Sequence, residues 1–113
     1  MRGVGIDIVE IQRFEEAIKR FGDDFLKKIF TEKELKYSLN KKNKFQHLAA
    51  RFACKEAVIK AIGKSLNLKE IEILNEPNGK PFCKINNSLY KDSKIFISLS
   101  HTHNYATAIA ILT

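Results

Sequence analysis

The spacing of hydrophobic residues changes along this chain, and the change limits the folds that it can adopt. Between residues 11 and 62 most apolar positions recur every three or four residues, which is typical of amphipathic helices. After Gly63 they alternate with other residues, which is typical of strands. Helices followed by a run of strands predict an α+β fold, in which an antiparallel sheet packs against helices.

Residues that start or stop helices divide the helical part of the chain. Gly22 is expected to end a first helix, Asp23 or Asp24 to cap a second, and a Thr31–Glu34 capping box to open a third. The predicted helices cover residues 11–21, 25–30, 31–39 and 45–62. The predicted strands cover residues 3–9, 70–73, 82–85, 95–100 and 105–112, with a turn at 77–81 and a helical turn near Leu89.

The chain has 113 residues, of which 44% are hydrophobic, so we expect one domain, residues 1–113, with a packed core. The net charge is +7, and residues 1–64 contribute fifteen Lys and Arg against nine Asp and Glu. Acidic or phosphorylated partners are therefore expected mainly at this half. Cys54 and Cys83 are expected to be reduced core residues. A signal pattern and a membrane-length apolar run are not evident, which predicts a cytoplasmic protein.

Charged residues recur on the predicted helix 45–62. Glu56 and Lys60 are four residues apart and share a face, and Arg51 and Lys55 share a neighbouring face. Spacing alone favours a solvent-exposed surface with an ordinary Glu56–Lys60 ion pair.

Asp7 suggests a second interpretation, because a carboxylate among the apolar residues of a strand is costly to bury without a partner. Magnesium is typically bound by one or two carboxylates, so Asp7 and Glu56 would suit it if the fold brings them together. Otherwise Asp7 would face solvent from an edge strand.

Two later turns carry groups that can hold a phosphate or merely close a turn. In the turn 78–81, Gly79 could expose backbone N–H groups beside the ammonium of Lys80. Residues 98–102 place hydroxyl groups and His101 at a strand end. His101 and His103 lack a third ligand with zinc spacing, so a structural or phosphate-facing histidine is expected.

Taken in order, five segments resemble the holo-acyl-carrier-protein synthase family, the small bacterial phosphopantetheinyl transferases. The resemblance extends from about Val4 to Leu112, and the ordered set is far more specific than any one segment. Cys54 stands where alanine is usual, which changes little because both are small. The segments are Gly5–Ile11 (GIDIVEI), Phe30–Glu34 (FTEKE), Arg51–Ala61 (RFACKEAVIKA), Asn78–Pro81 (NGKP) and Ser98–Thr102 (SLSHT).

This resemblance implies a metal site, coenzyme A contacts and an oligomeric state. It makes Asp7 and Glu56 the ligands of Mg²⁺ and assigns the coenzyme A diphosphate to Lys60; all three residues are expected to be catalytic. It also implies a homotrimer with active sites between neighbouring subunits. Further coenzyme A contacts are implied at Arg51, Lys55, Asn78, Gly79, Lys80, Pro81 and His101.

The implied reaction is attack by a serine hydroxyl of acyl carrier protein on the β-phosphorus of coenzyme A. Phosphopantetheine is transferred, in support of fatty acid biosynthesis, and adenosine 3′,5′-bisphosphate leaves. Such transfer depends on positioning and charge neutralisation, which Mg²⁺ and Lys60 would supply. Glu56 would remove the serine proton, directly or through a metal-bound water. We expect the acidic carrier protein to dock on a basic stripe formed by Arg13, Ala17 and Arg20, with Phe21 at its edge.

Two other classes of protein remain compatible with the sequence. A nucleic-acid-binding domain would fit the basic character of the chain, although no helix-turn-helix, zinc-finger or RNA-binding signature is present. A non-catalytic domain that holds coenzyme A or a carrier protein would keep the basic residues but would not need both Asp7 and Glu56.

Overall fold

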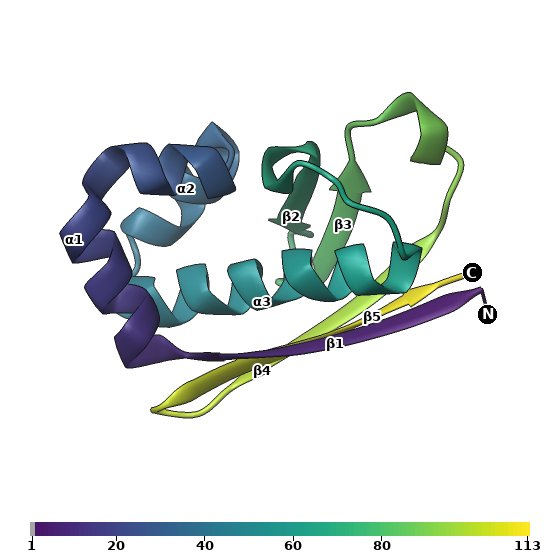
Figure 1. The fold of residues 1–113 in the computed structure, drawn as a ribbon. Coiled ribbons are helices and arrows are strands. Elements are labelled where there is room, and N and C mark those ends of the chain that lie inside the picture. The colour runs from purple at the N-terminus through teal and green to yellow at the C-terminus, as the bar shows by residue number, and fades with distance from the viewer. Residues whose placement is uncertain (1) are drawn as a thin grey trace.

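A computed structural model describes residues 2–113 and shows an α+β architecture (Figure 1), which confirms the predicted fold class. The central helix α3 lies across one face of a three-stranded sheet. Helices α1 and α2 and a two-stranded sheet lie on the side of α3 that faces away from the three-stranded sheet. The elements are β1 (Gly3–Glu10), α1 (Ile11–Ile29), α2 (Glu32–Leu39), α3 (Lys44–Ile62), η1 (Leu68–Glu70), β2 (Ile71–Asn75), β3 (Pro81–Ile85), η2 (Ser88–Tyr90), β4 (Ile95–His101) and β5 (Tyr105–Leu112).

The helix boundaries follow the predicted signals. At α2 the Thr31 hydroxyl accepts a hydrogen bond from the Glu34 N–H, and the Glu34 carboxylate accepts one from the Thr31 N–H, so the capping box is confirmed. Gly63 ends α3 in the left-handed region at φ 80°. At Gly22 φ is 72° and the backbone is not helical, so α1 consists of two helical stretches that meet at a kink, and the predicted interruption between residues 11–21 and 25–30 is confirmed.

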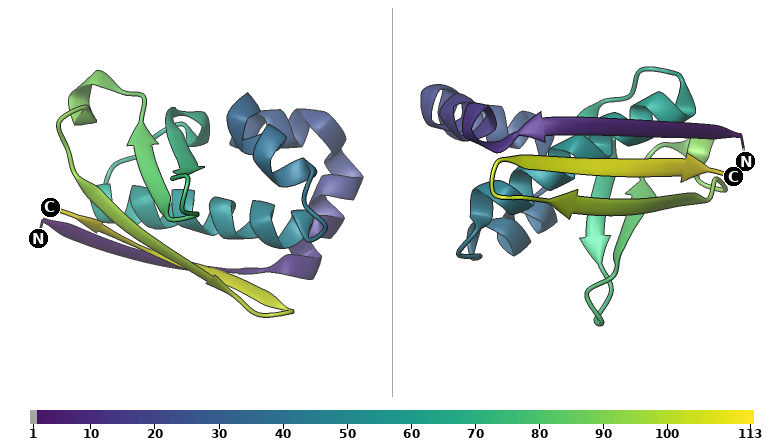
Figure 2. Two further views of the ribbon diagram at one scale, coloured as in Figure 1. Left: turned by 180° about the vertical axis from the view of Figure 1, so that it is seen from behind. Right: turned by 90° about the horizontal axis from the view of Figure 1, so that it is seen from below.

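The strands form two antiparallel sheets, whereas the sequence predicted one without separating them. The larger sheet has the order β1–β5–β4, and β2 and β3 form a separate hairpin around the predicted turn. β1 pairs with β5 from Gly3 opposite Leu112 to Glu10 opposite Tyr105. The two ends of the described chain therefore lie side by side (Figures 1 and 2).

Small residues allow α3 to approach the larger sheet closely. The face of β5 toward α3 carries buried alanines at alternate positions within residues 106–110. A Cβ atom at Gly3 would overlap the carbonyl oxygen of Ala61, and one at Gly5 would overlap that of Ala57. Only glycine permits this spacing, which places the side chains of α3 directly against β1.

No element within residues 2–113 covers the opposite face of the larger sheet (Figure 2). This face carries exposed hydrophobic side chains. On β1, Val4, Ile6 and Ile8 are 53, 63 and 66% exposed. Phe96 on β4 and Ile109 on β5 are also exposed. The sheet is therefore packed on one side only.

The two cysteines are free thiols, as predicted; Cys54 is buried and Cys83 is half-buried. Burial, followed by the negative charge of Glu34, raises the pKa of Cys83 to about 12, so this thiol stays protonated. No helix within residues 2–113 combines the length and apolar character needed to cross a bilayer.

Candidate active site

Asp7 lies in the middle of β1, on the face of the strand that points toward α3. Its neighbours Ile6 and Ile8 point the other way and are exposed, while the Asp7 side chain is only 19% exposed. β1 is an edge strand, as one interpretation of the sequence required, but the carboxylate faces the helix. The alternative in which Asp7 faces solvent is therefore wrong.

Glu56 and Lys60, one turn apart on α3, lie against this part of β1. Lys60 Nζ is 3.1 Å from Asp7 Oδ1 and donates a second hydrogen bond, of 2.9 Å, to the carbonyl oxygen of Ile6. Spacing along α3 predicted an ion pair between Glu56 and Lys60, but the ion pairs found within residues 2–113 do not include it. Lys60 pairs across the helix–strand interface instead.

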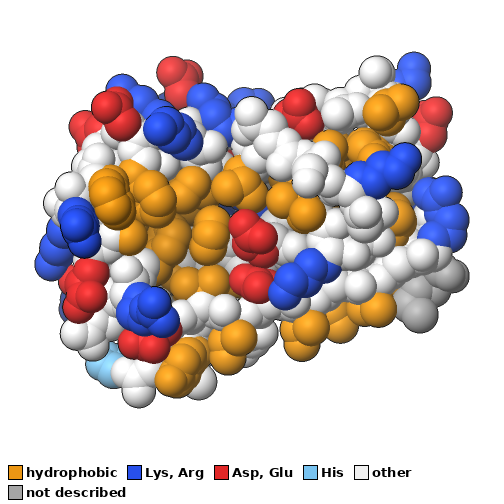
Figure 3. Space-filling view, viewed as in Figure 1, with side chains coloured by type: hydrophobic (Ala, Val, Ile, Leu, Met, Phe, Trp, Pro, Cys, Tyr) orange, Lys and Arg blue, Asp and Glu red, His pale blue; other side chains and the backbone are white. Residues whose placement is uncertain are grey.

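Asp7 and Glu56 line one open groove of about 450 Å³ between β1, α1 and α3. On this side of the molecule, acidic and basic side chains lie next to a broad hydrophobic area (Figure 3). The residues that line the groove are Asp7, Ile8, Val9, Glu10, Arg13, Phe14, Ala17, Phe25, Phe52 and Glu56.

The two carboxylates carry more negative charge than Lys60 balances. Burial, followed by the charge of Asp7, raises the pKa of Glu56, and Lys60 opposes this rise only in part. Asp7 and Glu56 are a suitable donor set for Mg²⁺, which fills its other positions with water and phosphate oxygens. No cluster of three or more His, Cys, Asp or Glu side chains that could hold a metal is found within residues 2–113, so a cation here would complete its coordination with water or phosphate oxygens.

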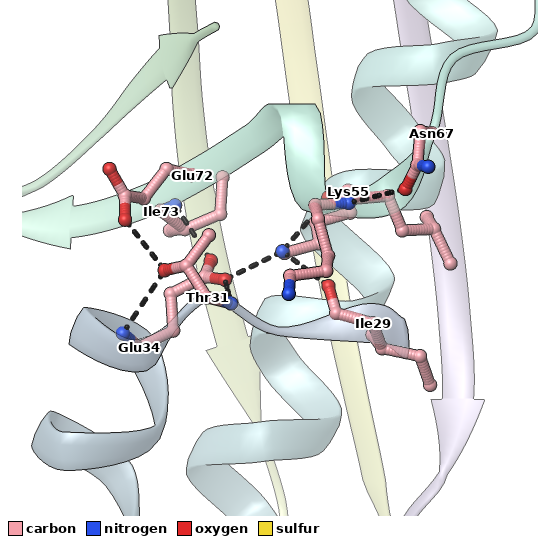
Figure 4. Close-up of polar contacts among 9 residues, drawn as sticks. Ile29, Thr31, Glu34, Lys55, Asn67, Glu72 and Ile73 are labelled. Atoms are coloured by element: carbon pink, nitrogen blue, oxygen red, sulfur yellow. Dashed lines mark hydrogen bonds and ion pairs between the residues drawn. The ribbon is translucent and has the colours of Figure 1, made fainter. Parts of the chain in front are cut away.

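Lys55 is not available to a cofactor, which corrects the expectation from the sequence. Its buried ammonium group donates to Glu34 Oε1 at 2.6 Å and to the carbonyl oxygens of Ile29 and Leu68 at 2.7 and 3.0 Å (Figure 4). Burial lowers the pKa of Lys55, and the charge of Glu34 opposes this shift. All three N–H groups have partners inside the protein, so the predicted coenzyme A contact is wrong.

Arg51 is also internal, being only 4% exposed. Its guanidinium lies 4.5 Å from the ring centre of Tyr37 and donates to Asn75 Oδ1 and to the carbonyl oxygen of His47. Asn75 in turn donates to the carbonyl oxygen of Gly79 at 2.9 Å. The Arg51 side chain therefore supports the β2–β3 turn from within, and its contact with coenzyme A stays a prediction.

The turn Asn78–Pro81 is largely exposed, but backbone N–H groups expected to be free are already used. Gly79, at φ 91°, donates its N–H to the carbonyl oxygen of Glu76 at 2.8 Å. The N–H of Lys80 donates to Asn78 Oδ1 at 3.0 Å. A phosphate at this turn would have to be held by exposed side chains such as that of Lys80.

His101 lies at the end of β4, and β5 separates β4 from β1. The strands of His101 and Asp7 are therefore about 10 Å apart at the backbone. Neither His101 nor the β2–β3 turn lines the groove of Asp7 and Glu56. A single chain brings together Asp7, Glu56 and Lys60, and leaves His101 and the turn outside their groove.

Six residues that line the groove were not predicted from the sequence as site residues: Ile8, Val9, Glu10, Phe14, Phe25 and Phe52. Phe52 precedes Glu56 by four residues on α3, so helical spacing offered a signal for it. Phe25 lies on the helical stretch predicted after Gly22, but no spacing pattern placed that stretch beside Asp7.

Paired carboxylates beside a lysine are typical of enzymes that transfer phosphate-containing groups with a divalent cation. The family model of the 4′-phosphopantetheinyl transferase superfamily matches residues 3–110. The holo-[acyl-carrier-protein] synthase of Thermodesulfovibrio yellowstonii is 49% identical over 100% of this chain and 99% of its own length.

Solved structures agree with the sequence relatives. Neisseria meningitidis holo-[acyl-carrier-protein] synthase superimposes with a TM-score of 0.91 at 29% identity, covering 100% of this chain and 98% of that one. The Helicobacter pylori enzyme in complex with coenzyme A gives 0.88 at 28% identity, with 97% and 99% covered. The chain belongs to the holo-acyl-carrier-protein synthase family of 4′-phosphopantetheinyl transferases.

Proposed function

We propose that this chain transfers 4′-phosphopantetheine from coenzyme A to a serine of apo acyl carrier protein, giving holo carrier protein and adenosine 3′,5′-bisphosphate. The observation that carries the proposal is the meeting of Asp7, Glu56 and Lys60 in a chain of this family. Coenzyme A in the Helicobacter pylori structure supports its role as donor. The reaction would serve fatty acid biosynthesis in the cytoplasm.

In this proposal Asp7 and Glu56 hold Mg²⁺. When bound, the cation would neutralise charge on the diphosphate of coenzyme A. The side chain of Lys60 is 55% exposed and flexible, which suits a further contact with diphosphate oxygens.

Glu56 is the proposed proton acceptor in the transfer step. The serine oxygen forms a bond to the β-phosphorus while the bond from that phosphorus to the adenosine bisphosphate oxygen breaks, and the serine proton passes to Glu56. Its place in the groove beside Asp7 supports this role, because a general base must lie within hydrogen-bond reach of the proton that it accepts.

The chain would act as a homotrimer with active sites between subunits. The uncovered hydrophobic face of β1, β5 and β4 supports an oligomer, because monomers rarely expose large contiguous apolar patches. His101 and the turn Asn78–Pro81 lie outside the groove of their own chain, so a neighbouring subunit would use them to complete its coenzyme A site.

The carrier protein would dock on α1. Arg13 and Ala17 line the groove that contains Asp7, so the basic stripe borders the proposed reaction site. Further along α1, the guanidinium of Arg20 lies 5.4 Å from the ring centre of Phe21. This arrangement would guide an acidic partner to the groove.

Mass spectrometry of apo acyl carrier protein incubated with this chain, coenzyme A and Mg²⁺ tests the function. We expect a serine-linked gain of one phosphopantetheine mass. Glu56→Gln should abolish nearly all transfer with the fold intact by circular dichroism, whereas Glu32→Gln, an exposed position on α2, should leave transfer unchanged. Absence of the gain contradicts the function, and full activity of Glu56→Gln contradicts the role of Glu56.

A further inference from the structure

The ammonium group of Lys60 already neutralises one of the two carboxylates of the proposed metal site. It lies 3.1 Å from Asp7 Oδ1 and 2.9 Å from the carbonyl oxygen of Ile6, so two acceptors on β1 hold it. The Lys60 and Asp7 side chains are 55 and 19% exposed. Lys60 is therefore directed across to β1 while remaining accessible to solutes.

Lys60 takes this position although Glu56 precedes it by four residues on the same helix. That spacing is the one at which Glu and Lys usually pair, yet within residues 2–113 the ion pair found for Lys60 is with Asp7. Glu56 is left with a raised pKa. The cluster thus holds two carboxylates and one ammonium group, and the ammonium group is committed to Asp7.

A divalent cation and the ammonium group of Lys60 compete for the carboxylate of Asp7. Both are positively charged, and two positive charges in contact with one carboxylate repel each other strongly. A cation that uses both carboxylates must displace Lys60 from Asp7 Oδ1. The displaced ammonium group then needs another anion. The diphosphate of coenzyme A supplies one, since its oxygens accept strong charge-assisted hydrogen bonds.

We propose that Lys60 is an internal counter-ion that keeps Asp7 from divalent cations until coenzyme A is bound. This inference rests on the proposed function, which makes Asp7 and Glu56 metal ligands and coenzyme A the donor. The cation binds the ligand-free protein weakly and the coenzyme A complex more tightly. By thermodynamic reciprocity, the cation also raises the affinity for coenzyme A.

Titration of the ligand-free protein with Mn²⁺, followed by the electron paramagnetic resonance signal of the free ion, tests this competition. Lys60→Met keeps an unbranched side chain but removes the charge, and it should raise the Mn²⁺ affinity about fivefold, the effect of losing one partly exposed ion pair. Lys60→Arg retains the charge and should bind Mn²⁺ as weakly as the unchanged protein.

Lys64→Met is the matched control. It removes one positive charge just beyond the end of α3, and no ion pair of Lys64 is found within residues 2–113. It should change the affinity less than about twofold, because exposed charges at a distance are screened by salt. Combining Lys60→Met with Asp7→Asn should remove the gain, since the competition is for Asp7.

Repeating the titration with saturating coenzyme A gives a second readout. The unchanged protein should now bind Mn²⁺ more tightly than without coenzyme A, and the advantage of Lys60→Met should disappear. Circular dichroism checks that each variant keeps its fold.

The inference is wrong if Lys60→Met binds Mn²⁺ no more tightly than the unchanged protein, or gains no more than Lys64→Met. Its failure is distinct from failure of the proposed function. If the unchanged protein modifies carrier protein but Lys60→Met shows no gain in Mn²⁺ affinity, only the counter-ion role is contradicted. The expected Mn²⁺ pattern without carrier modification contradicts only the function.

Discussion

The carboxylate of Glu34 connects three parts of the fold where solvent does not reach it. It accepts hydrogen bonds from the backbone N–H groups of Thr31 and Ile73, both at 2.8 Å, and from Lys55 Nζ at 2.6 Å (Figure 4). These donors belong to the start of α2, to β2 and to α3. Because Lys55 directly precedes Glu56, the network fixes the turn of α3 that carries this proposed catalytic residue.

Lys55→Met should destabilise the protein by about 3–5 kcal/mol, because it leaves the charge of Glu34 buried without its cation. Urea unfolding followed by circular dichroism measures the loss. Lys19→Met breaks an exposed pair with Glu15 and should cost less than about 1 kcal/mol. Adding Glu34→Gln to Lys55→Met should recover part of the stability. Equal losses in Lys55→Met and Lys19→Met would show that the buried pair has no special weight.

At the residue scale, the sequence predicted which charged side chains share a face but not how deeply each face is buried. Glu56 and Lys60 were correctly placed together, and the structure brings both to Asp7. Arg51 and Lys55 were assigned to coenzyme A, although elements distant in the chain cover that side of α3. Burial of this kind depends on tertiary packing, which residue spacing does not contain.

β1 and α3 approach each other more closely than most side chains would allow, and the candidate site depends on this contact. Gly5 lies against the backbone of Ala57. Asp7 follows two residues later on the same face of β1, next to Glu56. The sequence included Gly5 in a family motif, but no spacing pattern shows what lies opposite a glycine.

Gly5→Ala should separate β1 from α3 and cost about 3 kcal/mol, because the added Cβ atom would overlap the Ala57 carbonyl oxygen. Gly63→Ala is the comparison: its surroundings are open but its φ is 80°, so conformational strain alone should cost about 1 kcal/mol. Urea unfolding measures both. A smaller loss at Gly5 than at Gly63 would contradict the importance of the close approach.

Helix α1 provides the proposed docking surface. Arg13→Glu combined with Arg20→Glu should raise KM for carrier protein about tenfold by reversing charge toward an acidic partner, with nearly normal coenzyme A binding. Steady-state kinetics and calorimetry measure the two effects. Lys27→Glu with Lys28→Glu reverses as many exposed charges beyond the kink of α1 and should have a smaller effect. Unchanged carrier kinetics in the arginine variant would place docking elsewhere.

The order of elements was predictable, whereas their partners in space were not. A short apolar run identified β1 and alternating residues identified β5, but neither pattern specifies which strands pair. Likewise, Gly22 and the acids after it predicted two helical stretches, but not that the second stretch would bring Phe25 to the groove. The division of the strands into two sheets arises from contacts with α3 on both of its sides.

The molecule as a whole has one packed and one unpacked sheet face. α3 covers the first, and exposed Val4, Ile6, Ile8, Phe96 and Ile109 lie on the second. The proposed homotrimer would bury this second face. The same association would explain why the predicted coenzyme A contacts do not all meet within one chain.

Ile6→Lys with Ile8→Lys should convert the proposed homotrimer to monomers and reduce transfer, because buried charges would oppose association. Size-exclusion chromatography with light scattering measures the mass. Phe82→Lys with Leu89→Lys changes exposed apolar residues outside the larger sheet and should leave the assembly intact. A monomeric unchanged protein, or a trimer that survives both β1 substitutions, would contradict this interface.

The pairing of β1 with β5 also affects how the protein is made on the ribosome. Gly3 pairs with Leu112, so β1 has no strand partner until the residues of β5 have been synthesised. At ordinary translation speeds this delay is on the order of ten seconds. During this delay the apolar side chains of β1 have no strand beside them, so we expect aggregation to compete with folding while the chain is being synthesised.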